Sequence, residues 1–448
     1  MAKPFPQTIA EAQGSFLEGL SPLTVVKACL DRIQEQNDRL RALIFIARAE
    51  ALEEAQQAEA AIRAGKRIGP LHGIPVAVKD MIDVRDWQTT GGSRLFEKDD
   101  ALSDARCVAN LRSAGAIIIG KSNLHELTAG NHDNPWYGKV VNPLDPERGT
   151  GGTSSGSAAA VAAGFCFAAI GTDTGGSNRS TAAATGLVGF KPTNGVINST
   201  GTMPTAPTFD TIGPIARNVA DARLIHFAMA GIDLPEAKSV SVAGMRIGLC
   251  PDLYAAAVDP AIATAHDAFL VSAQRAGAQI QVLPFQFARE VRETGLTILM
   301  YEFTANYGQL VEAYPERVGA AVRDFLSNGA SISNAAYQSA LAYRAQIQSE
   351  FQRLLSEVDV LVTPVVPGFA PRMSDEQTAV GGDFVPYGLA GGYFRRWANF
   401  FGVPTLAMPI PIPGVLPASV QITSPRNTES YLFSACEALS RLETGSAN

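Results

Sequence analysis

The spacing of apolar residues near the start of the chain predicts two helices. Ser21 precedes Pro22, an arrangement typical of a helix that serine caps and in which proline takes the first position. Apolar side chains then recur at helical spacing, at Leu23, Val26, Cys29, Leu30 and Ile33. An alanine-rich, charged segment predicts a second helix from about residue 47 to residue 64.

Short runs of β-branched and aliphatic residues predict the strands of the fold. They lie at residues 74–78, 116–119, 167–170, 245–249, 279–283, 358–362 and 419–422. Helical patterns lie between these runs, and such alternation is typical of a parallel sheet with both faces covered. We therefore expect an α/β fold with a large mixed, mostly parallel β-sheet that helices cover on both faces.

The rest of the chain predicts one domain with an inserted layer. The length of 448 residues exceeds that of a usual domain, but one large α/β body with an inserted cap fits it. In residues 234–336 amphipathic helical patterns, such as 261–276 and 315–326, replace the glycine-rich loops, and we expect a helical cap there. Residues 364–393 are rich in proline, glycine and aromatic residues, which predicts a long loop at a pocket or on the surface. The expected organisation is a single domain over residues 1–448.

Composition and charge restrict the class of protein. Apolar residues make up 46% of the chain and charged residues 18%, so much of it should be interior or line a pocket. A net charge of −7 disfavours nucleic acid and anionic membrane as main partners. The N-terminus lacks an apolar signal-peptide core, and the longest apolar stretch, residues 158–170, is too short to span a bilayer. We expect a cytoplasmic protein without a membrane anchor.

Cysteine and histidine are sparse and widely spaced. The five cysteines include no Cys-x-x-Cys pattern, which argues against a disulfide framework and a structural zinc site. The five histidines show no metal-ligand spacing such as His-Glu-x-x-His. We therefore expect no metal, and a group other than imidazole must act as the base.

Two familiar motif patterns fit the sequence but not its context. Residues 115–122 match the phosphate-binding loop, yet their variable positions form an apolar strand where that mechanism needs a flexible loop. Residues 152–156 match a nucleophile elbow, yet residues 142–149 before them are turn-forming. The elbow also needs a later histidine, and both His226 and His266 lie on helical patterns. Nucleotide binding and an α/β-hydrolase are therefore disfavoured.

Lys79 is the first candidate for the chemistry. It ends the apolar strand at residues 74–78, so its ammonium should lie in a medium of low dielectric, where burial lowers the pKa of a lysine. A neutral lysine can accept a proton. The alternative is a lysine that pairs with Asp80 or Asp83 or reaches solvent.

A glycine-rich loop provides the second candidate. Residues 171–177 read Gly-Thr-Asp-Thr-Gly-Gly-Ser and lie between the predicted strand 167–170 and a helical pattern at 178–184. Ser177 is thus expected at a strand-loop-helix junction. The backbone N–H groups that can converge there to stabilise an oxyanion belong to Thr174, Gly175, Gly176 and Ser177. The alternative is a tight glycine turn followed by a serine N-cap.

Four motifs in this order carry a resemblance to a known family. They are Leu-His-Gly-Ile-Pro-Val-Ala-Val-Lys-Asp at 71–80, Gly-Gly-Thr-Ser-Ser-Gly-Ser at 151–157, Gly-Thr-Asp-Thr-Gly-Gly-Ser at 171–177, and Val-Gly-Phe-Lys-Pro-Thr at 188–193. With them the chain resembles the amidase signature family. Similar segments at 120–126, 209–217, 358–364 and 402–409 extend the resemblance over most of the chain.

The resemblance implies the amidase signature fold and a mechanism. The family cleaves amides with a serine nucleophile, a second serine in a cis peptide, and a lysine. Ser177 matches the nucleophile and Lys79 the base. Thr153 stands where the relay serine belongs, and its hydroxyl can donate and accept hydrogen bonds as serine does. Ser154, the next residue, is the alternative relay.

Residues around the nucleophile support this comparison and also depart from it. Asp173 and Arg179 match family residues that support the loop without reacting. Asn178 replaces the usual isoleucine, and Ser180 and Thr181 replace apolar and proline positions, so the surroundings of Ser177 should be more polar. Six aromatic residues are candidates for a substrate pocket or for the core: Trp136, Tyr137, Tyr301, Tyr387, Phe394 and Trp397.

The resemblance leaves the substrate and the assembly open. We expect a small carboxamide, carbamate or urea-like substrate cleaved through an acyl-enzyme, with no cofactor. Two alternatives are an amidotransferase-type subunit that works in a complex and a catalytically silent, amidase-like binding protein. Residues 194–201 differ from the pattern typical of subunits that amidate charged tRNA, which weakens the first alternative. A homodimer is compatible with the sequence.

Overall fold

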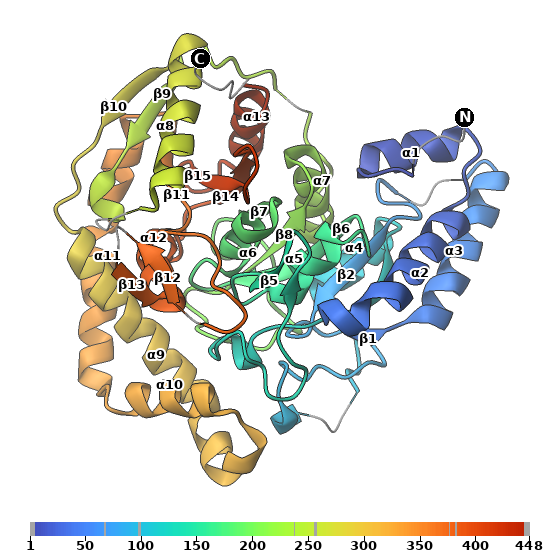
Figure 1. The fold of residues 1–448 in the computed structure, drawn as a ribbon, viewed down its shortest axis with the longest axis horizontal. Coiled ribbons are helices and arrows are strands. Elements are labelled where there is room, and N and C mark those ends of the chain that lie inside the picture. The colour runs from blue at the N-terminus through green and yellow to red at the C-terminus, as the bar shows by residue number, and fades with distance from the viewer. Residues whose placement is uncertain are drawn as a thin grey trace.

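Helices and strands alternate along the chain in the computed structural model (Figure 1), which describes residues 5–66, 69–96, 100–236, 238–254, 258–375, 377–380 and 383–442. The helices of the described part are α1 (Ile9–Leu17), α2 (Pro22–Leu40), α3 (Arg48–Arg63), α4 (Arg106–Ser113), α5 (Ser155–Ala162), α6 (Ser177–Thr185), α7 (Val219–Ala230), α8 (Pro260–Arg275), α9 (Ala288–Ala313), α10 (Ala320–Ala330), α11 (Asn334–Ser356), α12 (Tyr387–Phe401) and α13 (Glu429–Leu439). The strands are β1 (Leu43–Ile46), β2 (Pro75–Lys79), β3 (Ile117–Ser122), β4 (Val141–Asn142), β5 (Asp145–Gly149), β6 (Ala168–Asp173), β7 (Val188–Lys191), β8 (Thr211–Ala216), β9 (Arg246–Leu249), β10 (Gln279–Val282), β11 (Val360–Pro364), β12 (Gln377–Val380), β13 (Asp383–Pro386), β14 (Thr405–Ile410) and β15 (Ala418–Thr423).

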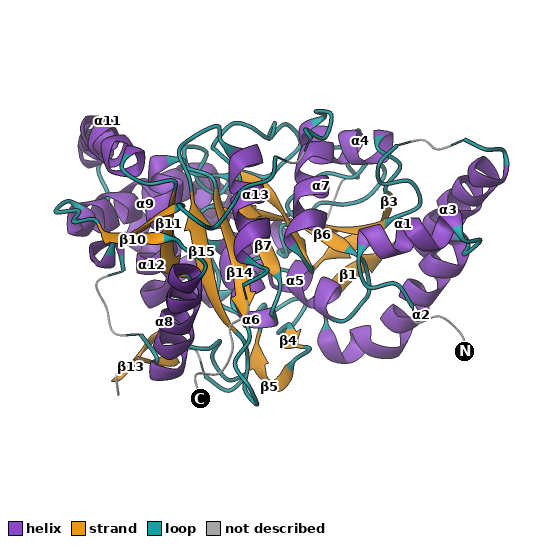
Figure 2. Cartoon of the chain, turned by 90° about the horizontal axis from the view of Figure 1, so that it is seen from above, coloured by secondary structure: helices purple, strands orange, loops and turns teal. Residues whose placement is uncertain are grey.

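One large mixed sheet organises the molecule, and helices cover both of its faces. Its 11 strands follow the order β1-β3-β2-β6-β8-β7-β14-β15-β11-β9-β10. Parallel pairing joins β3, β2 and β6 in one part and β11, β9 and β10 in the other. The strands between these two groups pair antiparallel. Figure 2 shows α5 and α6 on one face and α7 and α13 on the other. The expected α/β architecture is thus present.

The strands that the apolar pattern predicts all lie in this sheet, as β2, β3, β6, β9, β10, β11 and β15. The pattern misses β1, β7, β8 and β14, and every pairing of these four strands is antiparallel. Gly189 lies in β7, Gly213 and Pro214 in β8, and Pro409 in β14. Glycine and proline weaken the sequence signal of a strand. The sheet is thus mixed, as expected, with parallel pairing in two parts and antiparallel pairing between them.

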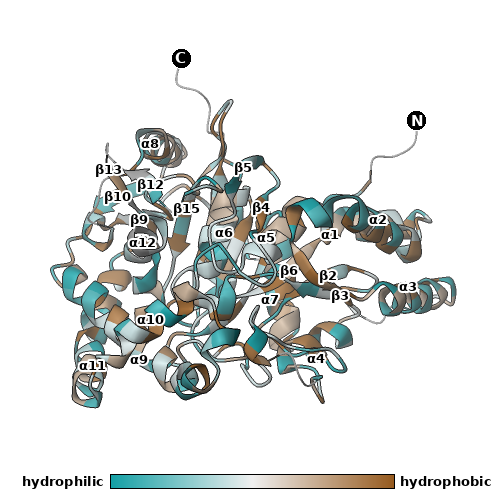
Figure 3. Ribbon diagram, turned by 60° about the horizontal axis from the view of Figure 1, so that its bottom comes forward, coloured by the Kyte–Doolittle hydropathy of each residue, from teal (hydrophilic) through white to brown (hydrophobic). Residues whose placement is uncertain are grey.

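Alternation along β2 sends side chains to two different cores. Val76 and Val78 belong to a core that includes residues of α7 and α13, whereas Ala77 packs with residues of α2 and α5. Figure 3 shows hydrophobic colouring along β2 and β6, which are neighbours in the sheet. Lys79 has the parity of Ala77, so its side chain points to the α5 face.

Helix α5 lies close to the sheet because its residues are small. It contains only glycine, serine, alanine and valine, and its residues from Ser155 to Val161 are buried. A β-carbon on Gly156 would collide with the backbone of Ala42 and Asn123. The glycine therefore lets the helix approach the neighbouring chain segments. This close approach fixes the N-terminus of α5 beside the end of β2.

Residues 234–336 contain the helices α8, α9 and α10 together with β9 and β10, the two strands predicted at residues 245–249 and 279–283. Both strands lie at one edge of the main sheet, and Figure 1 shows α9 and α11 on the same side of the molecule. That these helices form a cap over the sheet stays a prediction. Residues 364–393 do not form one long loop, because they contain the β12–β13 hairpin and the first turns of α12. Their proline and glycine content conceals the short hairpin and the helix start.

Candidate active site

The ends of two neighbouring parallel strands place the predicted residues together. β2 ends at Lys79 and β6 ends at Asp173, and Val78 lies opposite Ile170 in the parallel pairing. The carboxyl ends of these strands therefore meet at one edge of the sheet. The N-termini of α5 and α6 reach the same edge, where Ser177 begins α6.

A chain of hydrogen bonds connects the lysine with the candidate nucleophile. The Lys79 Nζ atom lies 3.0 Å from the Thr153 Oγ1 atom. The hydroxyl oxygens of Thr153 and Ser177 are also 3.0 Å apart. The peptide bond between Gly152 and Thr153 is cis. Thr153 and Ser177 are partly exposed, so a small molecule can reach the end of this chain.

Burial makes Lys79 suitable as a base. Its side chain is fully buried and donates to the hydroxyls of Ser154, at 3.0 Å, and Thr172, at 2.8 Å. Burial lowers the pKa of Lys79 to about 7, although the charges of Asp173 and Asp210 act in the opposite direction. A large fraction of Lys79 is therefore neutral near pH 7.

The alternative partners of Lys79 have other roles in the structure. Asp80 forms a buried ion pair with Lys121, with 2.9 Å between Asp80 Oδ1 and Lys121 Nζ. No carboxylate lies within ion-pair distance of Lys79 in the described ranges. The alternative pairing of Lys79 with Asp80 is thus not what the structure adopts.

Ser154 and Thr153 occupy different places relative to the nucleophile. The Ser154 hydroxyl donates to the Thr172 carbonyl oxygen at 3.0 Å and accepts a hydrogen bond from Lys79. It is fully buried, and no hydrogen bond joins it to Ser177. The geometry therefore connects Lys79 to Ser177 through Thr153, while Ser154 holds the lysine amine in place.

The glycine turn before Ser177 offers fewer backbone donors than the sequence predicts. The Gly176 N–H group donates to the Asp173 carboxylate at 2.9 Å, so it is not available to an oxyanion. Within the described residues, the N–H groups of Thr174, Gly175 and Ser177 have no hydrogen-bond partner. These three groups remain as candidate oxyanion donors. Gly176 has a φ angle of 108°, a conformation that glycine adopts readily.

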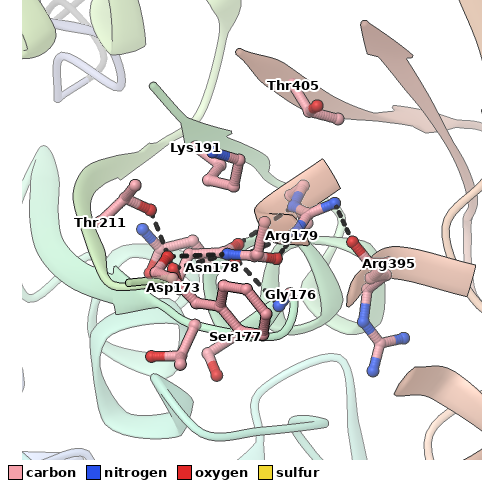
Figure 4. Close-up of polar contacts among 12 residues, drawn as sticks. Asp173, Gly176, Ser177, Asn178, Arg179, Lys191, Thr211, Arg395 and Thr405 are labelled. Carbon is pink, nitrogen blue, oxygen red and sulfur yellow. Dashed lines mark hydrogen bonds and ion pairs between the residues drawn. The ribbon is translucent and has the colours of Figure 1, made fainter. Parts of the chain in front are cut away.

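A buried ion pair supports this turn. The Arg179 guanidinium contacts both carboxylate oxygens of Asp173, each at 3.0 Å, and both side chains are fully buried. Arg179 also donates to the backbone carbonyl of Arg395 at 3.1 Å, and Figure 4 shows it between Asp173 and Arg395. Burial alone would raise the pKa of Asp173, but Arg179 and the hydrogen bond from Asn399 hold it below the usual range. Asp173 is thus a fixed negative charge that orients the Gly176 peptide.

The comparisons with known proteins agree with this geometry. A family model described as Amidase matches residues 24–433, which is most of the chain. The chain belongs to the Amidase family. Among curated relatives of this Amidase family member is the A subunit of glutamyl-tRNA(Gln) amidotransferase from Thermosynechococcus vestitus. The two are 34% identical over 398 residues, which cover 80% of this chain and 82% of the relative.

Solved structures include two kinds of relative of this Amidase family member. A crystal structure of an amidase superposes with a TM-score of 0.91 at 30% identity and covers 97% of this chain and 100% of that one. The A subunit of glutamyl-tRNA(Gln) amidotransferase from Thermotoga maritima superposes with a TM-score of 0.77 at 26% identity, covering 93% and 91% of the two chains. The fold is therefore common to both kinds of protein.

The unusual polar residues after the nucleophile of this Amidase family member bind backbone groups. The Asn178 amide donates to the carbonyl oxygens of Phe190, at 3.4 Å, and Gly213, at 3.1 Å, which lie in β7 and β8. The Ser180 hydroxyl donates to the Gly152 carbonyl, and the Thr181 hydroxyl to a carbonyl of its own helix. These side chains attach α6 to the sheet and to the first glycine loop.

The next features are the histidines, the possible metal ligands, the cysteines and the helix lengths in the described part of this Amidase family member. His125 lies against Gly152, and burial together with nearby positive groups lowers its pKa to about 3. In the described ranges, no group of three or more histidine, cysteine or acidic side chains is arranged to bind a metal ion. The five cysteines are buried and unpaired. Of the helices that the structure describes, none has the length and apolarity to cross a membrane.

Four of the six candidate aromatic residues have clearly different surroundings. Phe394 and Trp397 are core residues, since both are almost fully buried. Tyr301 stacks on Tyr337 with ring centroids 4.2 Å apart. Tyr387 lies near the site, because its hydroxyl oxygen is 3.3 Å from where a β-carbon on Gly151 would be. Of these four residues, Tyr387 is thus the one that contacts the first glycine loop.

Proposed function

We propose that this Amidase family member hydrolyses linear C–N bonds of small carboxamides, carbamates or urea-like compounds. The observation that carries the proposal is the hydrogen-bond chain from Lys79 through Thr153 to Ser177. A buried lysine with a pKa of about 7 and a partly exposed serine hydroxyl are the base and nucleophile that such chemistry requires.

In the acylation step, neutral Lys79 accepts a proton from Thr153 while Thr153 accepts one from Ser177. The Ser177 oxygen attacks the carbonyl carbon, and the carbonyl oxygen becomes an oxyanion. The N–H groups of Thr174, Gly175 and Ser177 are the donors available to it. The intermediate then expels the nitrogen, which receives a proton back through Thr153.

In the deacylation step, water attacks the acyl group on Ser177 and loses its proton through Thr153 to Lys79. The ester bond then breaks, the acid leaves, and Ser177 regains its proton. The overall reaction consumes one water and releases an acid and an amine or ammonia. Lys79 and Thr153 return to their starting protonation states, so each turnover leaves the site unchanged.

A second candidate is the amidotransferase-type subunit that works in a complex. The chain is 34% identical over 398 residues to the A subunit of a glutamyl-tRNA(Gln) amidotransferase. This identity favours the subunit over a free-standing hydrolase. The higher TM-score to an amidase, 0.91 against 0.77, and the divergent residues 194–201 favour the hydrolase. Both candidates use the same nucleophile and base.

The experiment that separates the candidates measures ammonia and amine release from a panel of small amides, carbamates and ureas. The purified chain is assayed alone and with amidotransferase partner subunits, beside the Ser177→Ala variant. Release by the chain alone that Ser177→Ala abolishes supports the hydrolase. Release only after the partners are added supports the subunit. Equal release by both proteins in every mixture contradicts enzymatic function and favours a silent binding protein.

The relay role of Thr153 predicts a specific response to substitution. Thr153→Val keeps the shape of the side chain but removes its hydroxyl, so proton transfer from Ser177 to Lys79 loses its connection. We expect kcat to fall about 10²- to 10³-fold, and Thr153→Ser to stay within about tenfold of the original. Steady-state kinetics on one amide substrate measure both.

Thr150 provides the matched control for this substitution. It lies in the same loop and is buried, and its hydroxyl has no hydrogen-bond partner among the residues that the structure describes. Thr150→Val therefore makes the same chemical change without breaking the chain to Ser177, and its kcat should stay near the original value. Equal kcat for Thr153→Val and Thr150→Val would rule out the relay.

A further inference from the structure

Two consecutive arginines of α12 lie against the glycine turn before the nucleophile. The Arg395 side chain packs against Gly176, where an added β-carbon would collide with its Cδ and Nε atoms. The Arg396 Nε atom is 3.7 Å from where a β-carbon on Gly175 would be. Figure 4 shows that the Arg395 side chain extends away from Arg179, which binds only its backbone carbonyl. Both guanidinium groups thus flank the turn that leads into Ser177.

These arginines are buried, and neither forms an ion pair with a carboxylate in the described part of the chain. Arg395 is 4% exposed and Arg396 is 8% exposed. The Nε atom of Arg395 and the Nε and Nη1 atoms of Arg396 have no hydrogen-bond partner within the described residues. Arg395 makes one hydrogen bond to a carbonyl, from Nη1 to Val365 at 3.2 Å. Asp173 precedes the same glycine turn, but its carboxylate is already paired with Arg179.

The burial of two such cations is unfavourable unless an anion accompanies them. Burial lowers the pKa of each arginine to about 10, so both remain charged near neutral pH. A carboxylate would accept hydrogen bonds from the free guanidinium N–H groups in a charge-assisted geometry. The Tyr387 hydroxyl, which is buried beside Gly151 and has no hydrogen-bond partner among the described residues, is a further donor near the first glycine loop.

Two glycines of α12 leave room for the guanidinium groups of Arg395 and Arg396. Gly391 and Gly392 lie one turn before Arg395 and Arg396, and long helical side chains point back toward that turn. A β-carbon on Gly391 would collide with the Arg395 guanidinium. One on Gly392 would lie 2.5 Å from the Arg396 Nη2 atom. Glycine inside a helix is unfavourable relative to alanine. The two glycines therefore lower the stability of α12, but their lack of a β-carbon leaves room for the arginine side chains.

We propose that the substrate carries a carboxylate close to the scissile amide, and that Arg395 and Arg396 bind it. This inference rests on the function proposed above and narrows its substrate class to short anionic amides. The separation between the two groups must be short, because the arginines contact Gly175 and Gly176, directly before Ser177. Succinamate, which has an amide and a carboxylate on a two-carbon chain, is a suitable probe, and its methyl ester is the neutral counterpart.

The first measurement is calorimetric binding of both probes to Ser177→Ala, which cannot turn them over. We expect succinamate to bind about 10- to 100-fold more tightly than the ester, as hydrogen bonds from charged donors contribute about that factor. Equal affinities would overturn the inference, whether or not the enzyme cleaves any amide. Selective binding without turnover by the original chain would contradict the proposed function and leave the anion site standing.

The second measurement assigns the preference to the arginines. Arg395→Gln and Arg396→Gln, each combined with Ser177→Ala, should reduce the ratio of the two affinities by about tenfold or more. Arg223→Gln is the matched control, because Arg223 in α7 is also 8% exposed with an unpartnered Nε atom, far along the chain from the loops. Circular dichroism spectra verify that each variant is folded. If the ratio falls equally in all three, or in none, the arginines do not bind the carboxylate.

Discussion

Replacement of Ser177 by alanine is expected to lower kcat for amide cleavage about 10⁴-fold or more. Ser177 supplies the oxygen that forms the acyl-enzyme, and without it no covalent intermediate can form. The residual rate then depends only on binding and on the backbone donors of the turn. Initial rates of ammonia release measure the loss. Intact mass after treatment with a fluorophosphonate should show one adduct on the original chain and none on the variant.

Ser155 is the control for this substitution. It is buried at the first position of α5, close in sequence to Thr153, and its hydroxyl has no hydrogen-bond partner in the described part of the chain. Ser155→Ala removes one hydroxyl from the same region without touching the chain to Lys79, so kcat should stay within about threefold of the original. An adduct that persists on Ser177→Ala would assign the nucleophile to another residue.

The sequence predicts the chemistry of the site better than its surroundings. Lys79, Thr153 and Ser177 lie in motifs whose order indicates the family, and the structure places them within hydrogen-bond distance of one another. The sequence cannot predict that the Gly176 N–H group donates to Asp173. That hydrogen bond depends on a φ angle of 108° and on the position of a carboxylate that Arg179 holds.

The residues that reach the site through long-range contacts are the ones that sequence motifs do not indicate. Arg395 and Arg396 reach the site from α12, and the hydrogen bond from Arg179 to the Arg395 carbonyl spans 216 residues. A local pattern of aromatic residues around two arginines does not indicate which segment they approach. The adjacent glycines at positions 391 and 392 are the signal that could have drawn attention to this helix, since glycine is unfavourable inside helices.

Local and long-range information also explain which strands of the sheet the sequence predicts and which it misses. The predicted runs at residues 116–119 and 167–170 are continuous apolar segments, which are typical of strands covered on both faces. The missed strands β7, β8 and β14 contain glycine or proline, and their antiparallel neighbours stabilise them. Pairing with strands distant in sequence decides their structure, and no window of the sequence contains that information.

Replacement of Lys79 by methionine is expected to lower kcat about 10⁴-fold, because Thr153 then has no acceptor for the proton of Ser177. For the original chain, kcat/KM should rise with pH, with its midpoint at about pH 7, and then level off as Lys79 loses its proton. The variant should keep its residual rate without that titration. A pH profile of Lys79→Met that matches the original chain would exclude Lys79 as the base.

The same substitution should change the pH dependence of stability in a defined direction. Lys79 has a pKa of about 7 in the folded chain, compared with 10.5 in its ordinary state. Between these values the unfolded chain binds more protons than the folded chain, so the free energy of unfolding rises with pH. Methionine does not titrate. The stability of the original chain relative to Lys79→Met should therefore increase by about 2–3 kcal/mol from pH 7 to pH 9.

Urea denaturation of both proteins at pH 7, 8 and 9 measures this trend, with fluorescence as the signal. The hydroxyls of Thr153, Ser154 and Thr172 lose the lysine as a partner in Lys79→Met, and that loss costs about 1–3 kcal/mol for each unsatisfied group. This cost does not depend on pH over the range, so it shifts the difference in stability without changing its slope. A slope of zero would show that Lys79 remains charged in the folded chain. In that case a neutral lysine could not be the resting form of the base.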